Sequence, residues 1–188
     1  MLTPDLTAAA AVAARGLAVF PLEPGGRRPA CSGWQLAATP APASWPAGAN
    51  IGVACRASGV VVLDLDVKNG DDGLGTFSWW LARHREQWPN TLTVATPSGG
   101  RHVYYRAPAG HVVVSSSGGA TRLGPGIDVR APGRRTGGWT VGPDSQIGGA
   151  RYEVVRDAPV RDLPGWLVPL LRPRRLSSGP TTRTSVGV

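Results

Sequence analysis

The sequence contains little cysteine and no long apolar run. Its 188 residues include two cysteines, Cys31 and Cys55, too few for a disulfide framework or a four-ligand zinc site, so no zinc is expected. No apolar stretch approaches the roughly 18 residues that a membrane-spanning helix needs. The apolar start TAAAAVAARG follows no basic region and precedes no clear cleavage site. These absences predict no membrane partner, with the cytoplasm as the default compartment.

Lysine is almost missing as well. Lys68 is the one lysine among twenty Lys+Arg, which face twelve Asp+Glu and leave a net charge of +8. An excess of positive charge fits a polyanionic partner, because neutralising phosphates releases counterions from nucleic acid. Basic proteins without such a partner are also common, so composition alone leaves both possibilities open. The 41% of apolar residues is enough for a folded core.

Glycine and proline divide the chain into short elements. Thr3 and Pro4 predict the start of a helix over 4–15, which ends before Gly16. We then expect a strand over 17–22, a long ordered loop over 23–49, strands over 50–55 and 59–66 with a turn at 58–59, a helix over 73–88, a hairpin over 91–108, strands over 126–133, 137–143 and 150–155, and a closing helical turn over 162–171. The chain should therefore form one domain over 1–171, followed by a flexible, basic, Ser/Thr-rich tail or linker over 172–188.

Two of the three histidines and the basic loop residues lie outside the segments with the strongest signals. His84 lies at helical spacing with the apolar residues of the 73–88 helix and is expected in the core, whereas His111 lies in a polar loop. The long loop carries Trp34, which favours a functional loop. The basic loop residues could follow a nucleic-acid backbone or form a solvated basic face; they include Arg27, Arg28, Arg134 and Arg135.

The segment VVVLDLD carries the strongest local signal. Side chains alternate along a strand, so Asp64 and Asp66 should point to one face with their Cα atoms roughly 6–7 Å apart. Two carboxylates so close repel one another, and a divalent ion with oxygen ligands such as Mg²⁺ or Mn²⁺ would relieve the repulsion. Alternatively, one aspartate caps the next turn while the other pairs with Lys68. Alone, the segment does not decide between these readings.

A third carboxylate, Asp128, lies in the strand-like segment GIDVR on the same face as Arg130. Such an Asp-x-Arg pair is often a structural ion pair. If this strand neighbours that of Asp64 and Asp66, however, the three carboxylates could hold two metal ions, an arrangement suited to in-line displacement at phosphorus. The site would then need a group that binds phosphate.

The hairpin segment TPSGGRH could supply that group. Gly99 and Gly100 would let backbone amides approach an anion, Ser98 adds a hydroxyl, and His102 could donate to a phosphate oxygen. A glycine-rich hairpin turn is often only a turn, and a lone histidine is often structural. Both readings stay open at this point.

Taken in order, VVLDLDVKNGDDG, TPSGGRHVYYRAP and GIDVRAPG resemble the three motifs of the bifunctional DNA primase/polymerase N-terminal domain family, within the archaeo-eukaryotic primase superfamily. The segments GLAVFPLEPGGRRP, SGW and NIGVA are also similar to the family, so the likeness covers about residues 5 to 155. It implies an α/β (α+β) fold with an RRM-like, mixed or antiparallel sheet flanked by helices, plus an N-terminal α/β unit. It further implies template-directed nucleotidyl transfer from dNTPs or NTPs on a single-stranded DNA template and primer.

Carried over residue by residue, the resemblance makes Asp64, Asp66 and Asp128 the ligands of two Mg²⁺ or Mn²⁺ ions. The contacts to the incoming triphosphate would be His102 with the turn Ser98-Gly99-Gly100, then Arg130 and, more weakly, Lys68. Many members continue into a helicase-like domain, so a helicase domain or subunit is a possible partner, and a plasmid, phage or other mobile element is a typical setting.

Two other functions fit parts of the sequence. A rolling-circle initiator nuclease would use Tyr104 or Tyr105 as nucleophile, but it normally needs paired histidines around its metal, and only His102 lies in a suitable strand. A non-catalytic module that binds single-stranded nucleic acid would need neither metal nor the aspartates.

Overall fold

The computed structural model describes residues 4–118 and 120–172. Within them the helices are α1 (Leu6–Ala13), α2 (Trp34–Ala37), α3 (Cys55–Ser58) and α4 (Gly73–Arg83). The strands are β1 (Val19–Pro24), β2 (Ala49–Ala54), β3 (Val60–Leu65), β4 (Val67–Lys68), β5 (Asp71–Asp72), β6 (Thr93–Ala95), β7 (Arg101–Arg106), β8 (Ile127–Arg130), β9 (Trp139–Val141), β10 (Gln146–Ile147), β11 (Ala150–Arg151), β12 (Glu153–Arg156) and β13 (Arg161–Asp162). The α+β fold expected from the sequence is confirmed.

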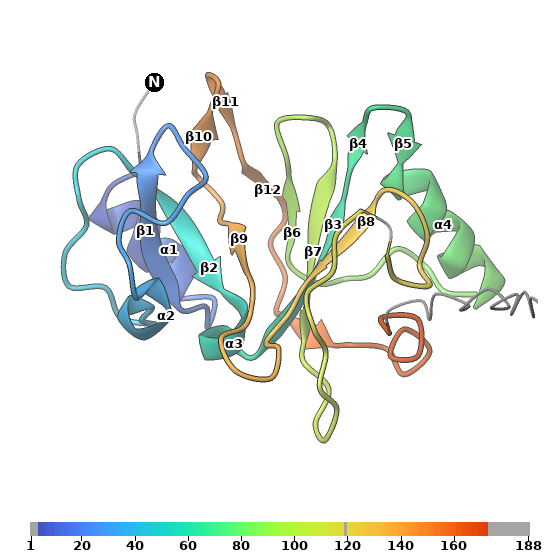
Figure 1. Ribbon diagram of the computed structural model, residues 1–188. Helices are drawn as coiled ribbons and strands as arrows, with labels where there is room; N and C mark the ends of the chain where they lie inside the picture. The colour runs from blue at the N-terminus through green and yellow to red at the C-terminus, as the bar shows by residue number, and fades with distance from the viewer. Residues whose placement is uncertain (1–3, 119, 173–188) are drawn as a thin grey trace, which may run out of the picture.

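Two sheets form the body of the molecule (Figure 1). The smaller sheet has the strand order β1-β2-β9, and the larger has the order β12-β6-β7-β3-β8, with β13 added parallel to β7. β3 lies between β7 and β8 and is antiparallel to both. This central position agrees with its sequence, since Val60–Leu63 are all buried.

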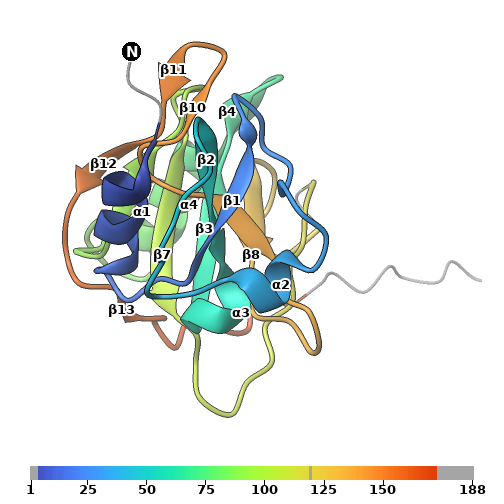
Figure 2. The same cartoon turned by 90° about the vertical axis from the view of Figure 1, so that its left-hand side faces the viewer.

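Each face of the larger sheet covers a separate core. On one face, Val60, Val62 and Tyr104 pack with α1 and the smaller sheet. On the other, Leu63 and Val103 pack with α4 and the segment 163–171. Figures 1 and 2 accordingly show α1 with the smaller sheet on one side of the larger sheet and α4 on the other. Alternation along β3 therefore assigns Asp64 to the face shared with the smaller sheet.

Several predicted boundaries need correction. The first helix is shorter than 4–15: Asp5 caps it by accepting a hydrogen bond from the Ala8 amide, and the C-cap is Ala14 rather than Gly16. The loop expected over 23–49 contains the one-turn helix α2, and the turn expected at 58–59 follows the one-turn helix α3. In both places the turn is too short to show a hydrophobic period.

The second half of the chain needs corrections as well. The helix predicted over 73–88 ends at Arg83, because Arg85 has a left-handed backbone with φ of 56°. His84 is exposed rather than buried in the core, and its ring stacks on Trp80 and Trp166. The closing helical turn expected over 162–171 needs no correction, because the segment forms consecutive turns in which the Leu171 amide donates to the Leu167 carbonyl at 3.2 Å. The tail predicted over 172–188 lies, beyond Arg172, outside the described residues.

Candidate active site

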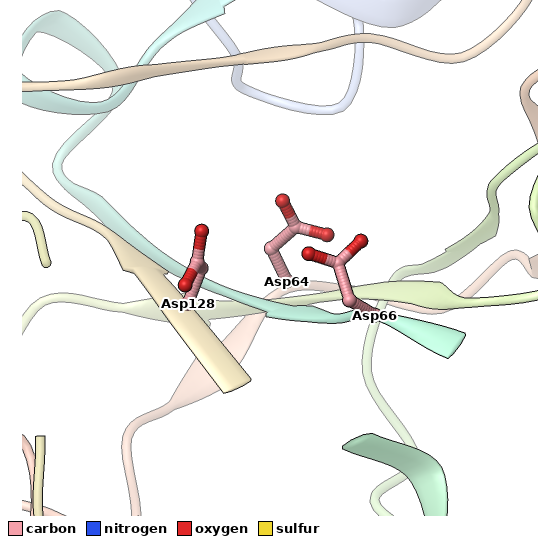
Figure 3. A group of neighbouring side chains, drawn as sticks. All are labelled: Asp64, Asp66 and Asp128. Carbon is pink, nitrogen blue, oxygen red and sulfur yellow. The ribbon is translucent and has the colours of Figure 1, made fainter. Parts of the chain in front are cut away.

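Three carboxylates converge at one end of β3. Asp64 lies in β3 directly opposite Asp128 of β8, and Asp66 follows the last residue of β3. One carboxylate oxygen from each residue lies within 4.8 Å of those from the other two. Figure 3 shows the three side chains pointing to the same side of the sheet. The sequence predicted this convergence from strand alternation and a neighbouring strand.

The backbone after β3 is held in place by two glycines. The Asp66 amide donates to the Gly126 carbonyl at 2.8 Å, and the Gly73 amide donates to the Asp66 carbonyl at 2.8 Å. The backbones pass so closely that a Cβ at Gly73 would collide with the Gly126 carbonyl oxygen. Neither position therefore accepts a side chain, and Asp66 stays beside Asp64 although it lies beyond the strand.

Basic groups already neutralise part of the cluster. The Lys68 ammonium lies 2.8 Å from an Asp66 oxygen, as the structural reading of the sequence suggested. The Arg130 guanidinium lies 3.0 Å from Asp128 and 3.7 Å from Asp64. The ion pairs and the convergence of the carboxylates thus coexist, and neither reading excludes the other.

His102 is buried and contacts groups from both sheets. Its Nε2 lies 3.3 Å from an Asp64 oxygen, and its Nδ1 lies 3.1 Å from the Thr140 hydroxyl on β9. β7 places it there, because His102 is the register partner of Asp64. The Tyr152 ring lies beside it, with 5.5 Å between the ring centroids. The imidazole is therefore oriented from both of its nitrogens.

These neighbours also determine the charge of Asp64. Burial alone raises the pKa of its carboxyl, but the hydrogen bond from His102 and the positive charges of Arg130 and Lys68 outweigh burial and lower the pKa from its usual value. Asp64 is therefore ionised at neutral pH. An ionised carboxylate is the form that a divalent cation binds.

The cluster lines a cavity of about 430 Å³ between the two sheets. This volume is in the usual range for small-molecule sites. The sequence-derived site residues that line it are Asp64, Asp66, Lys68, His102, Asp128 and Arg130. The lining also includes Arg27 and Trp34, both from the loop for which Trp34 favours a function. Acidic, basic and aromatic groups thus face one space.

Seven further residues line the cavity without a sequence pattern that marks them as site residues: Ser115, Gly137, Gly138, Trp139, Thr140, Val141 and Tyr152. Trp139 and Thr140 belong to the smaller sheet, which comes close to the cluster only because β9 returns beside β2. The alternating segment GGWTVGP indicated a strand but not its partner. No local pattern marks Tyr152.

The turn Ser98-Gly99-Gly100 does not line this cavity. The Ser98 hydroxyl lies 3.2 Å from the Thr96 hydroxyl, and Gly100 is buried where a Cβ would collide with the Leu65 carbonyl oxygen. Close packing against β3 therefore explains why position 100 is a glycine. A role for the turn in binding phosphate stays a prediction.

The two candidate tyrosine nucleophiles are both inaccessible. Tyr104 and Tyr105 are 0% and 1% exposed and lie in the two different cores. Burial raises the pKa of both hydroxyls, which disfavours the phenolate that would attack phosphorus. This observation weighs against the tyrosine nuclease alternative.

The donor atoms suit a hard divalent cation. The cluster offers carboxylate oxygens and no thiolate, and oxygen-only ligands are typical of Mg²⁺, Ca²⁺ and Mn²⁺. Cys31 is exposed and Cys55 is buried in the first core, so neither belongs to the cluster. Within the described residues, no helix is both long and apolar enough to cross a membrane.

Comparison with known proteins agrees with this geometry. A search of curated proteins finds no match to the chain. The family model described as "Bifunctional DNA primase/polymerase, N-terminal" (Prim-Pol) matches residues 9–166, which include every residue of the carboxylate cluster and its cavity. With its mixed α+β fold and three converging aspartates, the chain belongs to the bifunctional DNA primase/polymerase N-terminal domain family.

Proposed function

We propose that this chain is the catalytic domain of a DNA primase and DNA polymerase that performs metal-dependent, template-directed nucleotidyl transfer. The observation that carries the proposal is the set of three carboxylate oxygens within 4.8 Å of one another, in a cavity that also presents Lys68, His102 and Arg130. Acidic ligands for metal and basic contacts for phosphate in one space suit a nucleoside triphosphate. Membership of the family supports the same reaction.

Asp64, Asp66 and Asp128 would hold Mg²⁺ or Mn²⁺, and two ions would fit the chemistry of phosphoryl transfer. When bound, such ions polarise the triphosphate and lower the pKa of an attacking hydroxyl. The chain itself contributes fixed positions: Asp64 and Asp128 are register partners on paired strands, and two backbone hydrogen bonds hold Asp66. Such a rigid ligand set costs little reorganisation on binding.

The basic residues around the carboxylates would bind and orient the triphosphate. Arg130 extends a guanidinium between Asp64 and Asp128, from which it could turn to a phosphate oxygen. His102, with Thr140 on its other nitrogen, could donate Nε2–H to the triphosphate once Asp64 binds metal. Lys68 and Arg27 lie at the rim as further cations. These groups would offset the negative charge of the triphosphate.

The substrates in this proposal are dNTPs or NTPs, a single-stranded DNA template and a primer. A helicase domain or subunit is a proposed partner, and replication of a plasmid, phage or other mobile element is the proposed setting. The net charge of +8 supports a polyanionic substrate.

Primer extension tests the proposal. Wild-type protein should extend a labelled primer on a longer template with dNTPs and Mn²⁺ or Mg²⁺, and a chelator should stop the reaction. The Asp64→Asn/Asp66→Asn and Asp64→Ala/Asp66→Ala variants should lose at least about a thousandfold in kcat, because the metals stabilise most of the developing charge. Circular dichroism should show both variants folded.

The matched control is Asp157→Ala/Asp162→Ala, which removes two exposed carboxylates from surface ion pairs outside the cavity. It should extend primers like the wild type. Equal extension by the wild type and both double aspartate variants would end the proposal. DNA binding that needs neither metal nor these aspartates, with no extension, would favour the non-catalytic binding module. Covalent capture of nicked DNA would favour the initiator nuclease.

A further inference from the structure

A second cavity opens beside the first one. It has a volume of about 380 Å³, and its walls come from α2, α3 and the loop between β8 and β9. Trp34 lines both cavities, and the loop contributes Arg135 to the second and Gly137 to the first. The two spaces therefore adjoin on the side of the smaller sheet. We call the second one the arginine groove and define it by Trp34, Leu36, Arg56 and Arg135.

The arginine groove carries positive charge without acidic neighbours. The sequence has no Asp or Glu over residues 24–63 or 129–143, the two stretches that supply its walls. Arg56 and Arg135 are both exposed, and no carboxylate of the described chain lies within 4.0 Å of either. The Arg56 Nη1 donates to the Gly133 carbonyl at 3.5 Å, and guanidinium groups without a carboxylate partner are well suited to phosphate oxygens.

The loop that presents Arg135 has a defined shape. The Gly138 amide donates to the Ala131 carbonyl at 2.7 Å and closes the loop. A Cβ at Gly137 would lie 2.8 Å from the Cβ of Arg56, so the loop packs against α3 and keeps the two arginines on neighbouring walls. Figures 1 and 2 both show this loop beside α3. The charges are therefore part of one surface rather than independent side chains.

Apolar and aromatic groups line the same groove as the charges. Trp34 is half-buried and stacks on Phe20, with 4.5 Å between the ring centroids. Trp139 meets Trp34 edge-on and holds the indole from another side. Leu36 is 95% exposed. A groove that combines cationic side chains with an aromatic ring suits single-stranded nucleic acid, because bases stack on the ring while the phosphates are neutralised.

We propose that the arginine groove binds single-stranded DNA and guides the template strand to the metal site. The proposal rests on the proposed function, because the strand leaves the groove at Trp34, where the active-site cavity begins. Arg56 and Arg135 contact phosphates, and Trp34 and Leu36 contact bases. None of the acidic cluster takes part in this contact.

Fluorescence anisotropy with a labelled 16-nucleotide DNA strand tests the groove without catalysis, in EDTA and over a range of salt. The Arg56→Gln/Arg135→Gln variant should bind about tenfold more weakly than the wild type near 0.1 M salt. The slope of log K against log salt should fall by about 0.7 for each lost phosphate contact. The matched control Arg83→Gln/Arg85→Gln removes the same charge from the end of α4, on the other face of the larger sheet, and should bind like the wild type.

Primer extension then separates the groove from the chemistry. The Arg56→Gln/Arg135→Gln variant should show a KM for primer-template raised about tenfold, with kcat and the KM for dNTP unchanged. If DNA binding and the KM for primer-template are both unchanged in that variant, the groove proposal is overturned and the polymerase proposal is left intact. If the variant loses DNA binding and the wild-type protein extends no primer, the groove proposal stands and the polymerase proposal fails. Tighter binding of an RNA strand of the same sequence would overturn the assignment to DNA.

Discussion

At the scale of single residues, the orientation of His102 depends on a hydroxyl from the other sheet. The Thr140 hydroxyl and the His102 Nδ1 lie 3.1 Å apart, and both residues are buried. A buried donor or acceptor that loses its partner costs about 1–3 kcal/mol. Thr140 is therefore a positioning residue in the proposed function, because it acts through His102.

We expect Thr140→Val to lower kcat for nucleotide addition by about ten- to a hundredfold, because the ring loses its fixed orientation. Thr140→Ser keeps the hydroxyl and should restore most of the activity. Steady-state kinetics with both variants, with unfolding curves to compare stability, checks this expectation. Equal loss in the serine and valine variants would show that Thr140 acts through packing alone.

The two cysteines should differ in reactivity. Cys31 is exposed, whereas Cys55 is fully buried, and burial raises the pKa of its thiol to about 12. Titration with a thiol reagent should count one reactive group per native chain and two in guanidinium chloride. Rapid reaction of both thiols in the native protein would contradict the burial of Cys55.

Among single residues, the sequence could predict those whose neighbours are fixed by strand alternation. Asp64, Asp66 and His102 belong to this group, since their face follows from the period of two. Thr140 and Tyr152 could not be predicted, because they reach the cavity through pairing between distant strands. Helical spacing predicts His84 in the core, but the helix ends there and the ring stacks on Trp80 and Trp166.

At the scale of elements, the hairpin of β6 and β7 depends on Gly100. This residue is buried, and a Cβ there would collide with the Leu65 carbonyl and lie 3.0 Å from the Thr96 hydroxyl. The sequence identified the hairpin and its turn correctly, and it offered an anion contact for the glycines. Close approach of the two backbones explains Gly100 without an anion.

The Gly100→Ala variant should therefore lose about 1–3 kcal/mol of unfolding free energy, as overpacked sites do. Gly165→Ala is a suitable control, because a Cβ there meets nothing within 4 Å, and its effect should stay within about 0.5 kcal/mol. Urea unfolding of the three proteins gives the comparison. A loss at Gly100 no larger than that at Gly165 would mean that β3 gives way easily to the added methyl group.

Element types were more predictable than element ends. Apolar runs and glycine-proline punctuation located β2, β3, β7 and α4, because each buries a periodic set of side chains. The end of α4 depends on Arg85 in a left-handed conformation, which no composition rule favours for arginine. The one-turn helices α2 and α3 are shorter than one hydrophobic repeat and left no signal.

At the scale of the whole molecule, the core that lies between the two sheets contains residues of both. Residues of α1, β1 and β2 pack directly against residues of β3, β6 and β7. We therefore expect the described chain to unfold in one cooperative transition, with coincident curves from circular dichroism and tryptophan fluorescence. Two separated transitions would instead assign the sheets to independent domains and would contradict the single domain expected from the sequence.

In the proposed function, metal should stabilise the whole fold, because it would bind the native cluster and not the unfolded chain. At a Mn²⁺ concentration a hundred times the Kd, the gain is about 2.7 kcal/mol. Scanning calorimetry should show a rise in Tm for the wild type and for Asp157→Ala/Asp162→Ala, and none for Asp64→Asn/Asp66→Asn. An equal rise in all three proteins would place the bound ions elsewhere.

The contact between Lys68 and Asp66 gives metal binding a competitor that belongs to the chain. The ammonium group occupies one carboxylate oxygen of Asp66, and dilution or dialysis cannot remove it, since two residues of backbone tether it to its carboxylate. In the proposed function, a divalent ion at Asp66 would share that carboxylate with Lys68 or replace it. A replaced ammonium would leave Lys68 as a cation beside the bound triphosphate.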